Sequence, residues 1–174
     1  MTSARELKVR TINALIVYFS KFGNTRRIAE AVAEVMKQAG DARVVSIDQL
    51  TASDFEPADL VVMGCPTHAF NVPAEVHAIL GALPPGVLAG KPVAAFDTTV
   101  RAWPLRRLRA SPKLLDQLTR LGGRPATPPQ TFFVWARNPQ KTGEINLLRE
   151  GELERARQWA DEILRQLGKG AGEE

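Results

Sequence analysis

One short stretch of the chain combines the groups that hold an anion. Residues 20–25 read "SKFGNT"; they directly follow an apolar run, "ALIVYF", and precede a helical pattern. At the start of a helix, unpaired backbone N–H groups and the helix dipole both favour negative charge. Gly23 lets the backbone bend towards such a group, while Ser20, Thr25 and Asn24 can donate side-chain hydrogen bonds. The stretch predicts a phosphate site, with ordinary helix capping as the alternative.

Other phosphate and metal chemistries are excluded by the residues that are missing. The chain contains neither G-x-x-x-x-G-K-[ST] nor G-x-G-x-x-G, so it has no P-loop and no dinucleotide-binding turn. No arginine closely follows Cys65, which excludes a cysteine phosphatase, and the apolar run ends in Phe19 and Ser20 rather than in the acidic residues of a receiver domain. Because the chain has 2 histidines, 1 cysteine and no carboxylate cluster, we expect no metal site.

Apolar runs and amphipathic segments alternate along the chain, which predicts an α/β fold with a mostly parallel sheet and helices on both faces. Residues 48–57 are too short and too polar for a full helix, so a single turn or a loop is expected there. The predicted strands are 14–19, 42–47, 59–64, 91–96 and 130–135, and the predicted helices are 25–39, 73–83, 111–121 and 150–167. In open sheets of this kind, ligands bind outside the carboxyl ends of the strands, where the strand order reverses.

Composition bounds the protein class. With 174 residues, 44% hydrophobic and 24% charged, the chain fits one globular domain, 1–174, with an N-terminal extension at 1–11 and a frayed tail at 168–174. The net charge of +4 is too small an excess for a nucleic-acid-binding arm. We expect no membrane span and no signal peptide, and the single cysteine fits a cytoplasmic protein.

Two loops resemble those of the flavodoxin-like family. The family's phosphate loop is commonly T/S-x-T-G-x-T; Ser20, Gly23 and Thr25 match it, whereas Phe22 replaces the middle hydroxyl. In "GCPTHAFNVP", residues 64–73, the Pro-Thr pair matches the loop that follows the family's third strand. The resemblance extends over nearly the whole chain in element order. It implies a single doubly wound domain whose five-stranded parallel sheet has the order 2-1-3-4-5, with FMN at the boundary of the first and third strands.

The resemblance also implies a set of cofactor-binding residues. The first loop would hold the FMN phosphate, and the second would offer backbone N–H groups and an apolar wall to the ring. In the third loop, residues 96–112, Asp97, Thr98 and Thr99 would bond the ribityl chain or ring, and Trp103 would stack on the flavin or else pack under the loop or face a partner. His68 as an exposed loop residue and Asn71 as a helix cap are the alternatives to their flavin roles. The predicted set is Ser20, Lys21, Phe22, Gly23, Asn24, Thr25, Pro66, Thr67, His68, Ala69, Phe70, Asn71, Asp97, Thr98, Thr99 and Trp103.

The third loop is also strongly basic, with no acidic residue between Asp97 and Asp116. Such a cationic rim suits an acidic redox protein, the 2′-phosphate of NADPH or an anionic substrate, although a solvated helix start would have the same composition. Its cationic residues are Arg101, Arg106, Arg107, Arg109 and Lys113.

Two functions are compatible with these patterns. The first is an FMN-binding protein that transfers electrons to or from a redox partner protein, or reduces a small acceptor such as a quinone, with NAD(P)H as a possible donor. The flavin would supply the chemistry, so no catalytic side chain is expected. The second is a flavodoxin-fold binding module without flavin that uses the basic third loop to bind a partner. Retention of FMN separates the two.

Overall fold

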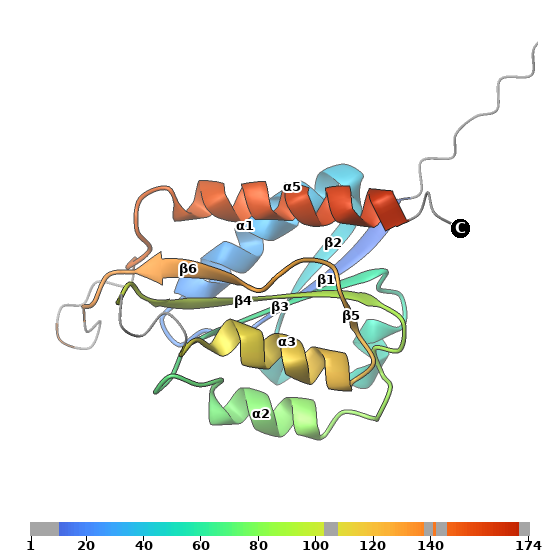
Figure 1. Ribbon diagram of the computed structural model, residues 1–174, viewed down its shortest axis with the longest axis horizontal. Helices are drawn as coiled ribbons and strands as arrows, with labels where there is room; N and C mark the ends of the chain where they lie inside the picture. Colours follow the sequence, from blue (N-terminus) through green and yellow to red (C-terminus); the bar gives the residue numbers. More distant parts are fainter. Residues whose placement is uncertain (1–10, 103–107, 138–140, 142–145, 171–174) are drawn as a thin grey trace, which may run out of the picture.

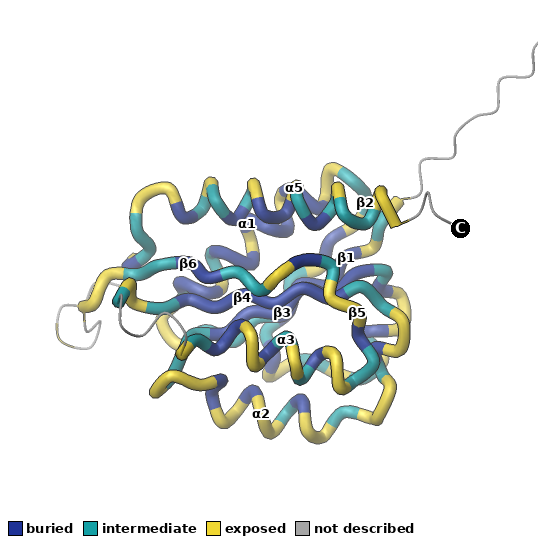
Figure 2. Tube along the Cα trace, viewed as in Figure 1, coloured by how far each residue is buried: buried dark blue, intermediate teal, exposed yellow. Residues whose placement is uncertain are grey.

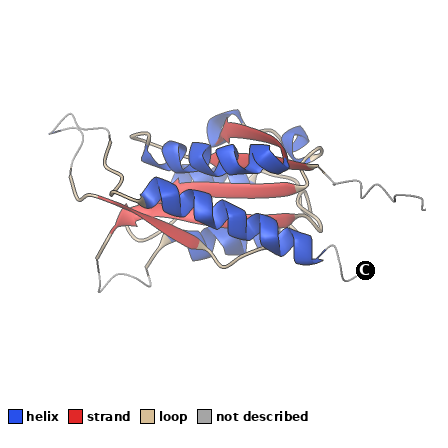
Figure 3. Cartoon of the chain, turned by 90° about the horizontal axis from the view of Figure 1, so that it is seen from above, coloured by secondary structure: helices blue, strands red, loops and turns tan. Residues whose placement is uncertain are grey.

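The computed structural model describes residues 11–102, 108–137, 141 and 146–170. One sheet lies between two layers of helices: α1 and α5 cover one face, and α2 and α3 cover the other (Figure 1). Viewed from above, the helices lie along the strands (Figure 3). The strands are β1 (Ile12–Tyr18), β2 (Gly40–Ser46), β3 (Leu60–Pro66), β4 (Pro92–Val100), β5 (Arg124–Pro125) and β6 (Gln130–Val134), and the helices are α1 (Asn24–Ala39), α2 (Ala74–Gly81), α3 (Ala110–Arg120) and α5 (Glu152–Gly170).

The sheet is parallel throughout, with the order β2-β1-β3-β4-β5, and β6 also pairs with β4. The predicted order 2-1-3-4-5 is confirmed, with β6 as the fifth predicted strand. One difference is that two segments share the last position, since β5 pairs with the start of β4 and β6 pairs with its end. Pro128 and Pro129 lie between them and have no N–H to donate, which accounts for the interrupted ladder.

Two hydrophobic cores arise from the alternation of side chains along the strands. In β1, Ala14 and Ile16 face α1 and α5, whereas Leu15 and Val17 face the opposite layer. The buried strands run through the interior of the tube in Figure 2, and most exposed positions lie on the outer surfaces of the helices and in the loops. Both faces of the central strands are therefore covered, which explains why they read as continuous apolar runs.

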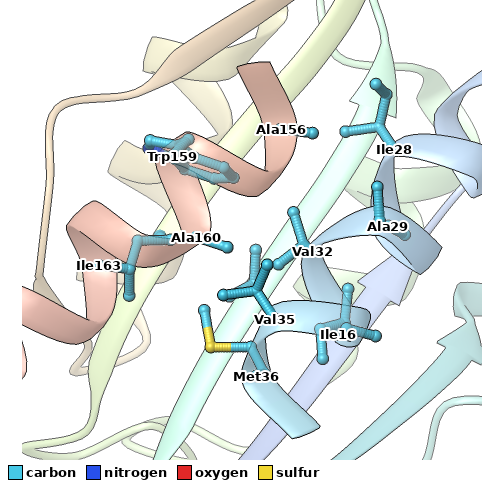
Figure 4. Close-up of a cluster of buried hydrophobic side chains, with 14 of the residues drawn as sticks. Ile16, Ile28, Ala29, Val32, Val35, Met36, Ala156, Trp159, Ala160 and Ile163 are labelled. Carbon is cyan, nitrogen blue, oxygen red and sulfur yellow. The ribbon is translucent and has the colours of Figure 1, made fainter. Parts of the chain in front are cut away.

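The contact between α1 and α5 forms the larger part of the first core. Figure 4 shows Val32 and Met36 of α1 close to Ala160 and Ile163 of α5, and all four side chains are buried. Residues spaced four apart lie on one helix face, and the alanines let the helices approach each other. The core also holds three aromatic rings, Phe96, Phe132 and Trp159, in edge-to-face pairs with centroids 5.8–6.0 Å apart.

Several predicted boundaries shift in the structure. Helix α3 begins at Ala110, so Ser111 lies inside its first turn and is not the cap that the Ser-Pro pair suggested. Helix α5 spans Glu152–Gly170, later than the predicted 150–167. The predicted turn or loop at 48–57 is confirmed as two short 3-10 helices, Ile47–Gln49 and Ala52–Phe55. Within the described ranges, no helix is both long and apolar enough to cross a membrane.

We predict that Gly64→Ala destabilises the protein. A Cβ at Gly64 in β3 would overlap the ring of Phe96, which is fully buried in the aromatic cluster and has no room to move away. The free energy of unfolding should fall by about 1–3 kcal/mol in urea titrations. The control is Gly81→Ala in α2, where no other atom lies within 4 Å and where alanine favours the helix. Equal stabilities of the two variants would contradict this account of the packing.

Candidate functional site

The sheet order creates a crevice beside β1. After β1 the chain passes through α1 to β2 on one side, and it then returns to β3 on the other side of β1. The loop after β1 and the loop after β3 therefore leave the sheet in opposite directions at neighbouring carboxyl ends, the arrangement that opens a ligand crevice.

The loop after β1 presents an uncapped helix end. Gly23 is the N-cap of α1 and has φ of +90°, a left-handed conformation that favours glycine, and no side chain caps the helix. The Ser20 hydroxyl accepts a hydrogen bond from the Gly23 N–H at 3.0 Å, which keeps the loop compact. The first turn contains no acidic residue but does contain Arg26 and Arg27. The two arginines lie beside the positive end of the helix dipole, which repels them. An anion bound at this turn would therefore be stabilised both by the dipole and by the arginines.

Asn24 and Thr25 point into the protein and fix this loop from below. The Thr25 hydroxyl lies 2.8 Å from the Thr98 hydroxyl of β4, and both residues are buried. The Asn24 Oδ1 accepts a hydrogen bond from the Leu147 N–H at 3.0 Å. The start of α1 is thus tied to β4 and to the segment that follows β6, so that its free N–H groups are held in a fixed position.

The loop after β3 forms a tight turn at residues 68–71. His68 and Asn71 exchange two backbone hydrogen bonds of 2.9 and 2.8 Å. The two residues between them, Ala69 and Phe70, both have positive φ (43° and 63°), although neither is a glycine. Such conformations cost about 1–3 kcal/mol each and concentrate at ligand sites. The Lys113 Nζ of α3 donates to the Phe70 carbonyl at 3.0 Å, which holds the turn against the helix.

A buried carboxylate connects this turn to the start of α3. Asp97 in the second half of β4 is fully buried, and its Oδ2 accepts hydrogen bonds from the Thr67 hydroxyl at 2.9 Å and the Ser111 N–H at 3.1 Å. The Thr67 hydroxyl oxygen accepts in turn from the Ala110 N–H at 3.0 Å. The negative charge lies at the positive end of α3, where the helix dipole stabilises it. Asp97 thereby fixes the second loop and the end of the third loop relative to each other.

A cavity of about 280 Å³ lies between the turn and the end of β4. Phe70 and Leu108 supply apolar walls, Thr67 and Thr99 supply hydroxyls, and Arg109 supplies a positive charge. Ala69, Val100 and Ala102 complete its lining. A mostly apolar slot with a few fixed polar groups is the usual form of a small-molecule site. A second cavity, of about 260 Å³, lies between α2 and α3, and Asn71 at the end of the turn contributes to its lining.

Two further side chains that could carry chemistry are those of Cys65 and His77. Cys65 is buried in β3, and burial, followed by the charge of Asp97, raises the pKa of its thiol, which therefore stays protonated. His77 lies on α2 with its ring Nδ1 paired to the Gln117 side-chain amide. In the ranges that the structure describes, no group of three or more His, Cys, Asp or Glu residues is arranged to hold a metal ion.

Comparison with known proteins agrees with this geometry. Residues 15–121, more than half of the chain, match the flavodoxin domain family. The chain belongs to the flavodoxin family. The cofactor of this family is FMN, and its general role is electron transfer. The predicted family, fold and cofactor are therefore confirmed.

Individual relatives show how far the similarity extends. A flavodoxin of Clostridium saccharobutylicum is 29% identical over 85 residues, which cover 48% of this chain and 53% of that protein. The chain thus spans about half the length of this relative. The solved structure of oxidised flavodoxin 1 from Bacillus cereus matches with a TM-score of 0.70 at 21% identity. The match covers 88% of this chain and 97% of the flavodoxin chain.

The same fold also occurs inside a longer redox protein. Rubredoxin oxygen:oxidoreductase of Desulfovibrio gigas matches with a TM-score of 0.70 at 19% identity, covering 90% of this chain but 36% of that one. Both structural similarities lie at low identity, so they support the fold alone.

Most of the predicted site residues gather around the crevice, and they fit FMN. The residues from Ser20 to Thr25 form the helix entrance, and those from Pro66 to Asn71 form the strand end and the turn. Thr98 and Asp97 lie beneath these loops as supports, because both are buried, whereas Thr99 lines the cavity. Trp103, Arg106 and Arg107 lie outside the described residues. Sequence reasoning missed Val100, Leu108 and Leu147, which carry no polar group that would have singled them out.

Removal of the Asp97 carboxylate should loosen the site and lower stability. Asp97→Ala would leave the Ser111 N–H and the Thr67 hydroxyl without their buried acceptor. We expect the free energy of unfolding to fall by about 2–4 kcal/mol in urea titrations. The control, Asp161→Ala on the exposed surface of α5, should change it by less than about 0.5 kcal/mol. An Asp97→Ala protein as stable as the control would show that the buried network does not hold the loops.

Proposed function

We propose that this protein binds FMN with the phosphate at the start of α1 and the ring in the cavity beside the Ala69–Phe70 turn, and exchanges electrons with a partner protein or a small acceptor such as a quinone. One observation supports this proposal above all. The first turn of α1, which has no side-chain cap and no acidic residue, lies on the other side of the switch point from the turn with two positive φ angles. NAD(P)H is a candidate donor, since Arg109 in the cavity lining could pair with one of its phosphates.

Each part of the site has a physical role in this proposal. The N–H groups that open α1 bind the dianionic phosphate, and the Ser20 hydroxyl, whose oxygen accepts from the Gly23 N–H, donates its own proton to a phosphate oxygen. Phe70 and Leu108 exclude water from the ring and orient it, while Thr67 and Thr99 bound its edge. Bound FMN supplies the capacity to accept and release electrons, and the chain supplies the environment.

The charges around the cavity would also affect the reduction of the ring. Arg109 lines the cavity, and the ammonium of Lys113 lies at the carbonyl of Phe70 on its wall. No carboxylate lines the cavity among the described residues. Positive charge near a ring that gains electrons stabilises the reduced, more negative form. This chain therefore favours a reduced ring more than an acidic pocket would.

Affinity measurements with FMN and riboflavin test the phosphate assignment. The purified protein should retain or take up one FMN per chain and bind FMN on the order of 100-fold more tightly than riboflavin, because riboflavin lacks the phosphate. Ser20→Ala should weaken FMN binding about tenfold and leave riboflavin binding unchanged. Flavin fluorescence quenching measures both constants.

The matched control is Ser53→Ala, an exposed serine in the Ala52–Phe55 helix, which should leave both affinities unchanged. A colourless protein that does not take up added FMN would instead favour the flavin-free binding module. Equal affinities for FMN and riboflavin would contradict the assignment of the phosphate to the start of α1. The same titration would still test the ring assignment, because riboflavin carries the same ring.

A further inference from the structure

Exposed apolar side chains gather at one edge of the sheet. The large hydrophobic residues that are exposed in the described ranges are Phe22, Phe70, Val100, Leu108 and Trp135, with 39–46% of each accessible to solvent. Phe22 follows β1, Phe70 follows β3, Val100 ends β4, Leu108 precedes α3 and Trp135 follows β6. Since all of these strands are parallel, their carboxyl ends meet at the same edge, over roughly 15 Å from β1 to β6. Scattered apolar residues are ordinary on a surface, but a cluster at one edge marks an interaction site.

Three arginines at this edge lie over aromatic rings. Arg101 and Arg109 lie over the ring of Phe133, with 5.8 and 5.4 Å to its centroid, and Arg149 lies over Trp135 at 4.1 Å. None of these three forms an ion pair with a described carboxylate. The arginines that do form such pairs lie on α1, β2 and α5: Arg26, Arg43, Arg155, Arg157 and Arg165.

Aromatic stacking holds these three guanidinium groups in place without neutralising them. An arginine over an aromatic ring keeps its charge and its hydrogen-bond donors while losing little side-chain freedom. The Nε of Arg149 is buried and has no hydrogen-bond partner among the described residues. We call the five exposed apolar residues together with Arg101, Arg109 and Arg149 the rim. The rim adjoins the cavity, because Phe70, Val100, Leu108 and Arg109 belong to the rim and also line the cavity.

The structure assigns the rim as the docking surface for an acidic redox protein; this rests on the proposed function, which places the exchangeable electrons in the cavity beneath it. Charge complementarity identifies the partner. Among the described loop residues that follow β1, β3, β4 and β6, the one carboxylate is Glu150, whereas the cationic residues include Lys21, Arg101, Arg109, Lys141 and Arg149. Aromatic and arginine side chains are also the residues most enriched in the energetically dominant parts of protein interfaces.

The exposed apolar groups distinguish a protein partner from a small anion or a nucleic acid. A small anion would need converging donors and no broad apolar surface. A nucleic acid would take most of its binding energy from many phosphate contacts. A partner protein uses both features: charge accelerates the encounter, and the apolar residues then exclude water at close contact.

Binding to proteins of opposite charge tests the assignment without relying on electron transfer. The probes are an oxidised acidic two-iron ferredoxin, a basic c-type cytochrome and a single-stranded oligonucleotide, titrated calorimetrically into the full chain at low and high salt. We expect the ferredoxin to bind most tightly and its affinity to fall at least tenfold at high salt. Flavin content is measured on the same samples, so a flavin-free preparation that still binds the ferredoxin would count against the proposed function and not against the rim.

Charge-matched double variants separate the rim from overall charge. Arg101→Ala with Arg149→Ala removes two rim charges outside the cavity lining and should weaken ferredoxin binding about tenfold. Arg165→Ala with Lys169→Ala removes the same net charge from exposed positions near the far end of α5 and should have little effect. Trp135→Ala should weaken binding at both salt concentrations, because it removes apolar contact. Equal effects of the two double variants, or tighter binding of the cytochrome or the oligonucleotide, would overturn the assignment.

Discussion

The constraint on which this structure depends is the pairing of β1 with β2 on one side and β3 on the other. Because all of these strands are parallel, each must be followed by a crossover, and the crossovers after β1 and β3 lie on opposite faces of the sheet. The polypeptide cannot cover the gap between them with its own backbone. The start of α1 is therefore left with free N–H groups at the edge of the sheet, and every feature of the proposed site is arranged around that end.

Rigidity at this edge comes from buried polar contacts between loops. The Thr25 and Thr98 hydroxyls join the first loop to β4, and Asp97 joins the second loop to the start of α3. These bonds are shielded from water and are correspondingly costly to break. The strained turn at Ala69 and Phe70 is kept in place by the same surroundings, through the Lys113 bond to its carbonyl. A flavin site needs such support, since its ring has to be held while electrons enter and leave.

The order of the elements could be predicted from the sequence because strands and helices have different hydrophobic patterns. The buried strands are continuous apolar runs, and the helices have apolar residues on one face only. Features that depend on contacts between distant residues could not. The two-residue β5 is too short to form a pattern, and its place is decided by the prolines that follow it. Ser111 is a residue type that often caps helices, yet the N-cap of α3 is Arg109, and the Ser111 N–H donates to Asp97, 14 positions earlier in the chain. Asp97 was expected to bond the cofactor as part of the third loop, and no local signal shows that it is buried.

The assignment of the phosphate to the start of α1 is tested most directly by a crystal structure of the protein with FMN. This account predicts phosphate oxygens within hydrogen-bond distance of the N–H groups around Gly23 to Thr25, and the ring against Phe70 and Thr67. A phosphate bound anywhere else, for example at the cavity between α2 and α3, or a ring lying outside the crevice between the first and second loops, would contradict it.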